Sequence, residues 1–293
     1  MGEIQEVFDY YESLINGNGL VGKSEYLMFI DWYVPKSGNS VVNKNGNSAI
    51  LTLNYAYTLN KAAEILDWLG YREKAANYRN QSRKYAEITR KLCFDTDKGI
   101  YADDPARTFY DQRASILAVL CGAHSEEESR ELMKKVLDDK THFDSEANLF
   151  YQFYLFEAME KTGVGDFTKE LQPWKEIVDM GMSGTPEKRI EQDPRSEIHP
   201  WTAHPVHFYF SLVAGIRPTS PGFKTVYIAP QPGKLETIVA NYPTQYGIIS
   251  LDLRFDKSGK VSGSITLPKV ISGEFEWQNK KVVLPSGKQT ILN

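Results

Sequence analysis

Cysteine is scarce in this sequence, which holds only Cys93 and Cys121 among its 293 residues. Two cysteines define neither a disulfide framework nor a metal set, and both fall on helical patterns, which predicts buried thiols. Glycine-rich phosphate loops, CxxC pairs and nucleophile elbows are missing as well. The apolar runs stay far below the ~20 residues that cross a bilayer. The sequence therefore predicts no metal, no cofactor and no membrane partner.

An excess of charge of one sign is also lacking. The net charge is -4, and basic and acidic residues are interspersed, unlike the basic surfaces of proteins that bind nucleic acids. Residues 1–15 read MGEIQEVFDYYESLI, an amphipathic helical pattern and not a signal peptide. The sequence thus predicts no nucleic-acid partner and leaves the cellular compartment open.

Helical periodicity fills the first two-thirds of the chain. Largely apolar helices alternate with more polar ones, and the glycines and the capping box Ser125–Glu128 mark helix ends. Paired inner and outer helices of this kind are typical of an α/α toroid of antiparallel hairpins. The expected helices span residues 3–15, 47–69, 72–92, 110–121, 125–138, 147–161 and 166–180.

The last third of the chain changes to short β-patterns separated by turn residues, which predicts an antiparallel β-sandwich. The helical pattern stops at GIRPTSPG, because proline and glycine interrupt a helix. We therefore expect a helical domain over residues 1–214 and a β-domain over 215–293. The expected strands lie within residues 224–232, 235–242, 246–255, 260–268, 274–279, 280–285 and 288–293.

A long polar stretch, Gly181–Phe223, joins the two patterns and contains three of the five histidines. Loops of this length and polarity are more often functional sites than plain connections. Glu187 follows a turn of small residues, where a carboxylate at the mouth of the toroid would activate water for glycoside hydrolysis. A solvated loop glutamate is the competing interpretation.

Other residues of this stretch have several possible roles. His199 and His204 suit a general base, a donor to sugar hydroxyls, a zinc ligand or a structural loop histidine; their spacing differs from the usual helical metal patterns. Trp201 suits either stacking on a sugar ring or filling the core. Outside the stretch, Asp31 and Trp32 form a second candidate, in which the ring faces a sugar and the carboxylate binds its hydroxyls.

Two segments resemble the C-terminal signature of bacterial α-L-rhamnosidases. They read RSEIHPWTAHP (195–205) and VAGIRPTSPGFKTVYIAP (213–230). The earlier MGMSGTPE (180–187) is similar to the family's Gly-x-Thr-Thr-x-x-Glu, although Ser183 and Gly184 depart from its usual threonine pair. FIDW (29–32) is similar to the family's Asp-Trp site. The resemblance extends over essentially the whole chain.

The resemblance implies an inverting glycoside hydrolase that removes terminal α-L-rhamnose from glycosides or polysaccharides. It makes Glu187 the general base, and it places the sugar-binding residues in one pocket: Asp31, Trp32, His199, Trp201 and His204. The family's general-acid motif, an Asp-rich segment with an Arg-Asp-Glu core, has no counterpart in this sequence. We therefore expect the C-terminal part of such an enzyme, with a partial toroid and with the N-terminal part as a possible partner.

Two alternatives remain open at this stage. The chain would also suit a non-catalytic or decayed carbohydrate-binding module that keeps an aromatic cleft. A polysaccharide lyase on the same toroid plan would instead use His199 or Tyr209 as base and Arg195 to neutralise a uronate. The position of Glu187 separates these interpretations, because a hydrolase needs this carboxylate in the cleft.

Overall fold

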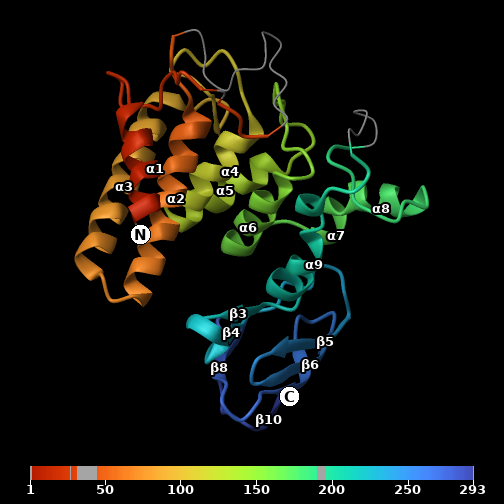
Figure 1. Ribbon diagram of the computed structural model, residues 1–293. Coiled ribbons are helices and arrows are strands. Elements are labelled where there is room, and N and C mark those ends of the chain that lie inside the picture. The colour runs from red at the N-terminus through yellow and green to blue at the C-terminus, as the bar shows by residue number, and fades with distance from the viewer. Residues whose placement is uncertain (1, 27, 32–44, 190–195, 293) are drawn as a thin grey trace. The chain divides into compact units, whose positions relative to one another are not determined.

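The computed structural model describes residues 2–26, 28–31, 45–189 and 196–292. The chain divides into two compact units (Figure 1). The first, which we call the helical unit, comprises Met1–Val164 and Glu187–Arg195. The second unit comprises Gly165–Pro186 and Ser196–Asn293.

The helical unit consists of helices that pack as hairpins, as the sequence predicted. Helix α2 packs on α3 and α4, and α4 packs on α5 and α6. A two-stranded ribbon, β1 paired with β2, precedes α4. The elements are α1 (Gly2–Ser13), α2 (Ala49–Trp68), α3 (Arg72–Cys93), β1 (Phe94–Asp95), β2 (Ile100–Tyr101), α4 (Gln112–Cys121), α5 (Glu126–Val136) and α6 (Gln152–Thr162).

The apolar and polar helices occupy inner and outer positions, respectively. Helix α4 is buried along almost its whole length, whereas α3 and α5 each bury one face and expose the other. This difference follows from their sequences, since an all-round apolar helix must be covered on several sides and an amphipathic one only on one. Cys93 and Cys121 are both buried thiols at the ends of α3 and α4.

The helix ends confirm the predicted signals. Gly70 and Gly122 adopt positive φ angles of 84° and 77° directly after α2 and at the end of α4, a conformation that costs glycine little. The Ser125 side chain accepts from the Glu128 amide while Glu128 reaches back to the Ser125 amide. This capping box satisfies two amides that the first turn of α5 leaves without helical partners.

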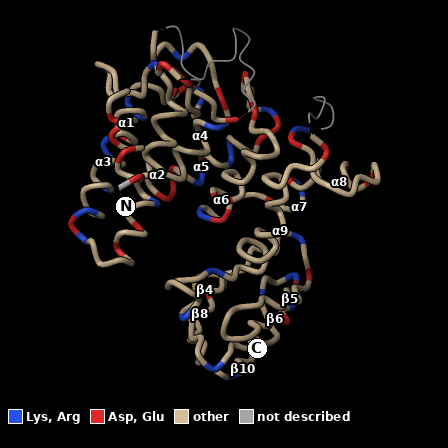
Figure 2. The backbone as a smooth tube through the Cα atoms, viewed as in Figure 1, with Lys and Arg blue, Asp and Glu red and all other residues tan. Residues whose placement is uncertain are grey.

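Charged residues of both signs are distributed along the helices and strands (Figure 2). Many pair locally, for example Arg90 with Glu128 and Lys134 with Glu131. In the part of the chain that the structure describes, no helix is both long enough and apolar enough to cross a membrane.

The predicted helix 166–180 is wrong as a single element. The second unit instead begins with two short helices, α7 (Phe167–Glu170) and α8 (Gln172–Asp179), with Leu171 between them at ψ 0°. Pro173 has no amide hydrogen to donate to the preceding turn, so the chain restarts there and places the proline in the first turn of α8. Likewise, α6 begins at Gln152 and not at 147.

A third short helix leads into the β-strands. Helix α9 (Pro205–Phe208) continues as a five-residue π-helical turn, Tyr209–Val213. Gly215 follows with φ 72°, and a Cβ atom there would lie 2.2 Å from the carbonyl carbon and oxygen of Ala229. Only glycine fits this close approach. The GIRP segment is therefore a backbone requirement of the fold.

The strands form two four-stranded sheets with the orders β10-β7-β6-β5 and β3-β4-β8-β9. Alternate side chains of both sheets are buried, including Leu251, Leu253 and Phe275, as expected where two sheet faces pack together. The strands are β3 (Ile216–Pro218), β4 (Thr225–Ile228), β5 (Thr237–Thr244), β6 (Gly247–Phe255), β7 (Val261–Thr266), β8 (Ser272–Trp277), β9 (Lys280–Leu284) and β10 (Gln289–Leu292).

All seven predicted strands are present, but two features of the sandwich differ from the prediction. Strand β3 was not anticipated, and β4 pairs with β8 in parallel although an antiparallel sandwich was expected. The parallel pair arises because β5, β6 and β7 form the other sheet, so that β8 returns beside β4 from a long crossover.

We expect the protein to lose stability as the pH falls from about 6.5 to about 4. Burial first, and Arg90 second, lower the pKa of His124 to about 4, against a smaller opposing effect of Glu128. The unfolded histidine, with a pKa near 6.5, takes up its proton first. The stabilisation is therefore complete above pH 6.5 and is lost toward pH 4, by about 1–3 kcal/mol.

Urea unfolding at pH 7 and pH 4 measures this loss. In His124→Gln the decrease should shrink, because glutamine takes up no proton in this pH range. The glutamine amide can still bond to the Tyr101 hydroxyl, which lies 2.8 Å from Nε2 of His124, so the variant should keep its fold. His142, whose side chain is 83% exposed, supplies the control His142→Gln. An equal decrease in His124→Gln and the wild type would contradict the assignment.

Candidate active site

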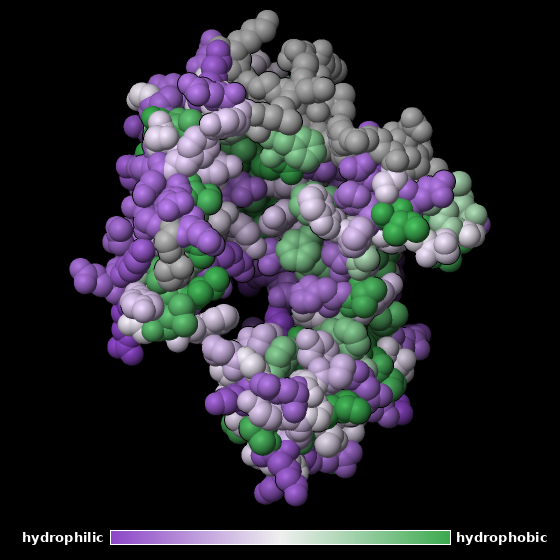
Figure 3. Space-filling view, in the orientation of Figure 1, coloured by the Kyte–Doolittle hydropathy of each residue, from purple (hydrophilic) through white to green (hydrophobic). Residues whose placement is uncertain are grey.

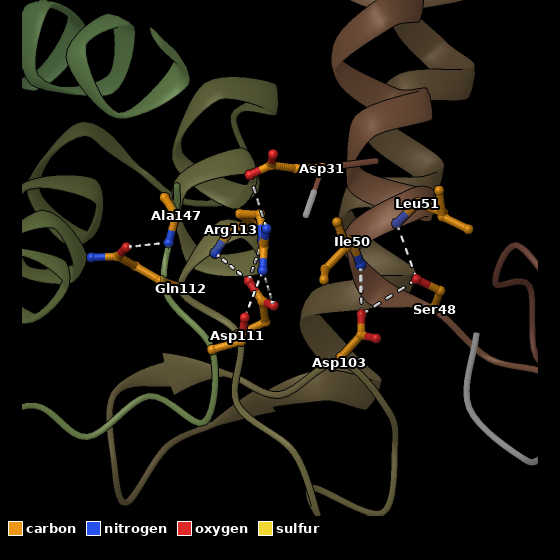
Figure 4. Close-up of polar contacts among 10 residues, drawn as sticks. Asp31, Ser48, Ile50, Leu51, Asp103, Asp111, Gln112, Arg113 and Ala147 are labelled. Carbon is orange, nitrogen blue, oxygen red and sulfur yellow. Dashed lines mark hydrogen bonds and ion pairs between the residues drawn. The ribbon is translucent and has the colours of Figure 1, made fainter. Parts of the chain in front are cut away.

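A buried ion cluster lies where the segment before Trp32 meets the start of α4 (Figure 4). The Arg113 side chain is completely buried and donates from Nε and Nη2 to the two oxygens of Asp111, each at 2.9 Å. Nη1 reaches Asp31 at 3.1 Å, and Nη2 also donates to the Ser145 hydroxyl at 2.6 Å. Burial opposes the charge, but Asp111 and then Asp31 raise the pKa of Arg113 above its ordinary value.

Asp31 is held by this cluster. Its side chain is only 3% exposed and faces Arg113. The carboxylate thus fixes the end of the segment that leads to Trp32, while Trp32 itself lies outside the described residues. The proposed contact of Asp31 with sugar hydroxyls stays a prediction.

A second buried carboxylate lies close by, at the start of α2 (Figure 4). Asp103 accepts from the Ile50 amide at 2.9 Å and from the Ser48 hydroxyl at 3.3 Å. Burial raises the pKa of Asp103 well above its ordinary value, and the bond from Ile50 opposes this only in part. Asp103 also holds the first turn of α2 through these two bonds.

The segment with His199 and Trp201 is fastened to the two residues that precede Glu187. The His199 amide donates to the Thr185 carbonyl at 2.7 Å, and the Thr185 hydroxyl donates to the His199 carbonyl at 3.1 Å. The buried Thr202 hydroxyl reaches the Pro186 carbonyl at 2.9 Å. These bonds belong to the second unit and hold the turn from which Glu187 emerges.

Glu187 begins the part of the loop that belongs to the helical unit. Its side chain is half-buried. Two residues on, the Arg189 amide donates to Oδ1 of the buried Asn148 at 3.3 Å. Asn148 lies three positions after Ser145, which binds Arg113. The backbone after Glu187 and the Asp31 cluster are thus both anchored to the segment that precedes α6.

Aromatic contacts orient the predicted sugar-binding residues of the second unit. His199 and Trp201 make an edge-to-face contact at 5.3 Å, and Trp201 is 61% exposed. His204 packs edge-on against Trp174 at 5.2 Å, while the Trp174 indole donates to the Thr202 carbonyl. Trp201 therefore does not fill the core, and much of its ring is exposed. His204 is half-buried.

The predicted site residues therefore fall in both compact units. Asp31 and Glu187 belong to the helical unit, and His199, Trp201 and His204 belong to the second unit. Their convergence into one pocket stays a prediction. Arg195, which the lyase alternative needs, lies outside the described residues.

Arg113 and Asp111 were missed by sequence reasoning. The signal was present, since Arg113 is a full charge on an otherwise apolar inner helix, QRASILAVLC. A charge at such a position has to be paired when it is buried. Its partner Asp31, 82 positions away, could not be identified from spacing.

Comparison with known families decides the affiliation of the chain. The model of the bacterial alpha-L-rhamnosidase six-hairpin glycosidase domain matches residues 2–211, and that of the bacterial alpha-L-rhamnosidase C-terminal domain matches residues 215–291. The chain belongs to the bacterial α-L-rhamnosidase family. No curated protein sequence matches it.

Solved rhamnosidases share the fold of this family member. A GH78 rhamnosidase of Bacillus sp. GL1 matches with a TM-score of 0.75 and 20% identity over 93% of this chain and 30% of its own. The α-L-rhamnosidase of Dictyoglomus thermophilum has a TM-score of 0.75 and 16% identity over 97% of this chain and 36% of its own. The α-L-rhamnosidase of Streptomyces avermitilis, solved in complex with L-rhamnose, has a TM-score of 0.70 and 16% identity over 98% of this chain and 30% of its own. The chain thus spans about a third of the length of these relatives.

Proposed function

We propose that this chain is the C-terminal part of an α-L-rhamnosidase that removes terminal α-L-rhamnose from glycosides or polysaccharides with inversion. The supporting observation is the family match across residues 2–211, which includes every residue that we assign to the site. We further propose that the glycosidase domain ends at residue 214 and the β-domain begins at 215.

Glu187 is the general base in this proposal. An inverting glycosidase uses one carboxylate to activate water and a second, about 6.5–9.5 Å away, to protonate the leaving oxygen. The half-buried Glu187 follows a turn that three hydrogen bonds of Thr185 and Pro186 hold to the segment of His199 and Thr202. A held backbone reduces the entropy lost when the carboxylate and water align. The family's general-acid motif has no counterpart in this sequence. In this proposal the chain therefore supplies the general base and lacks the general acid.

The remaining residues bind the sugar. Trp201 supplies an exposed ring for the apolar face of rhamnose, with His199 against it, and His204, Asp31 and Trp32 are further proposed sugar contacts. The relative from Streptomyces avermitilis was solved with L-rhamnose, and that from Klebsiella oxytoca with rhamnose bound. Rhamnose is therefore the first ligand to test.

Trp201→Ala is expected to weaken L-rhamnose binding by about 1–3 kcal/mol, the usual contribution of a stacked aromatic ring. Isothermal titration calorimetry of the folded protein measures the affinity. Trp68→Ala is a matched control, because Trp68 is exposed to 59%, close to the 61% of Trp201, and ends α2.

Binding that depends on Trp201 but not on Trp68 supports the assignment. If a folded Trp201→Ala variant keeps its affinity, Trp201 is not a sugar contact. If the wild type binds no rhamnose at millimolar concentration, the chain is neither a rhamnosidase part nor the rhamnose-binding module that is its nearest alternative.

A further inference from the structure

The segment 144–149, which lies between α5 and α6, is attached to the start of α4. The Gln112 amide donates to the Ser145 carbonyl at 3.0 Å. The Ala147 amide donates back to Oε1 of Gln112 at 2.9 Å (Figure 4), and the Arg113 guanidinium donates to the Ser145 hydroxyl at 2.6 Å. These bonds fix a stretch of backbone that has no helical hydrogen bonds of its own, so it can hold other groups in place.

Asn148 is a buried polar side chain of this segment. Many hydrophilic side chains of the helical unit lie on its surface (Figure 3), where water can bind them, whereas Asn148 is only 4% exposed. Its Oδ1 atom accepts from the Leu149 amide at 2.9 Å and from the Arg189 amide at 3.3 Å. A buried amide oxygen needs such partners, and here two backbone amides supply them.

Asn148 thereby joins the loop of the proposed base to a helix. Its own carbonyl accepts from the amide of Gln152, the residue that begins α6, at 3.0 Å. Arg189 follows Glu187 by only two residues. The bond between Asn148 and the Arg189 amide therefore restricts the backbone from which the Glu187 carboxylate projects.

A general base has to keep one oxygen within hydrogen-bond reach of the attacking water, and a displacement of about 1 Å can cost ~10²-fold in rate. Glu187 lies in a loop, without a helix or strand of its own to fix it. We propose that Asn148 is the positioning residue of this base and keeps the Glu187 carboxylate directed at the substrate. This inference rests on the proposed role of Glu187.

Hydrogen exchange of the Arg189 backbone amide, followed by NMR, tests the contact without reference to any activity. The amide should be protected in the wild type and should exchange about 3–10-fold faster in Asn148→Ala, the usual effect of one neutral hydrogen bond. Asn148→Asp keeps an acceptor oxygen at the same position and should retain the protection. Asn47→Ala is the matched control, because Asn47 is also an asparagine of the helical unit with 4% exposure.

Binding of a cationic analogue of L-rhamnose, in which NH replaces the ring oxygen, tests the positioning. The protonated amine mimics the positive charge of the transition state and pairs with a correctly placed carboxylate. In isothermal titration calorimetry, Glu187→Gln should weaken binding about 10–100-fold, the usual effect of one hydrogen bond to a charged group. Asn148→Ala should weaken binding about 3–10-fold in the wild-type background and should have no effect in the Glu187→Gln background. Asn47→Ala should have no effect in either.

The double mutant separates positioning from a general structural role. If Glu187→Gln weakens binding but Asn148→Ala acts equally in both backgrounds, or in neither, the proposed function stands and the role of Asn148 is refuted. An Arg189 amide that is unprotected in the wild type refutes that role as well, and this measurement needs no variant. If the wild type does not bind the analogue, or Glu187→Gln binds it equally well, the proposed function fails and the inference fails with it.

Discussion

Replacing Arg113 by methionine is expected to lower the free energy of unfolding by about 3–5 kcal/mol, the usual cost of removing one partner from a buried ion pair. Methionine fills much of the space of the arginine stem but leaves Asp111 and Asp31 as two buried acids. Both side chains are at most 3% exposed. Either they become protonated or they draw water into the unit, and both outcomes favour the unfolded state.

Urea unfolding at pH 7 measures this cost, and Arg79→Met is the matched control. Arg79 pairs with Asp67 at the surface, where the two side chains are 41% and 37% exposed. Exposed pairs contribute about 0–1 kcal/mol, so the same substitution should be nearly neutral there. A loss below 1 kcal/mol in Arg113→Met would show that the cluster does not hold the helical unit together.

Arg113→Lys separates charge from geometry in the same cluster. Lysine keeps the positive charge but cannot contact Asp111 through two parallel bonds while also reaching Asp31 and Ser145. We therefore expect Arg113→Lys to have a free energy of unfolding between those of the wild type and Arg113→Met. If Arg113→Lys were as stable as the wild type, the net charge alone would be sufficient.

The helices were predictable because each carries its own signal. Periodicity separated the buried α4 from the amphipathic α5, and Gly122 and Ser125 marked the turn between them. The break at Leu171 was missed because the apolar pattern continues through it, although Pro173 was visible in the sequence. The parallel pairing of β4 with β8 could not be predicted, since strand order depends on how two sheets pack.

Contacts among the candidate site residues could be predicted only where these residues are close in sequence. His199 and Trp201 lie in one motif, and local turns bring them together. Arg113 and Asp31 meet only after α2, α3 and α4 have packed.

Activity provides the most sensitive test of the proposed function. Natural rhamnosides should not be cleaved measurably by this chain, because their leaving alcohols need protonation and we propose that the chain lacks the general acid. General acid catalysis contributes about 10²–10⁴-fold, and most for poor leaving groups. The nitrophenolate of a nitrophenyl rhamnoside departs with little need for protonation. A trace of hydrolysis of this substrate can therefore persist if the pocket forms.

That trace should disappear in Glu187→Gln, because glutamine cannot accept a proton from water. Release of nitrophenol by micromolar protein over hours measures the rate. Glu131→Gln, at a side chain that is 65% exposed on α5, should retain the full trace. Hydrolysis that persists in Glu187→Gln would remove Glu187 from its role as base.

Robust turnover of a natural rhamnoside would contradict the proposed lack of an acid and would direct attention to Asp103, Asp104 and Glu25. Asp103 is then the first candidate, since burial raises its pKa above its ordinary value. Asp103→Asn should reduce the turnover of natural rhamnosides about 10²–10⁴-fold and leave the hydrolysis of the nitrophenyl substrate nearly unchanged. The loss of both activities together would instead indicate a structural role, because Asp103 also binds the amide of Ile50 at the start of α2.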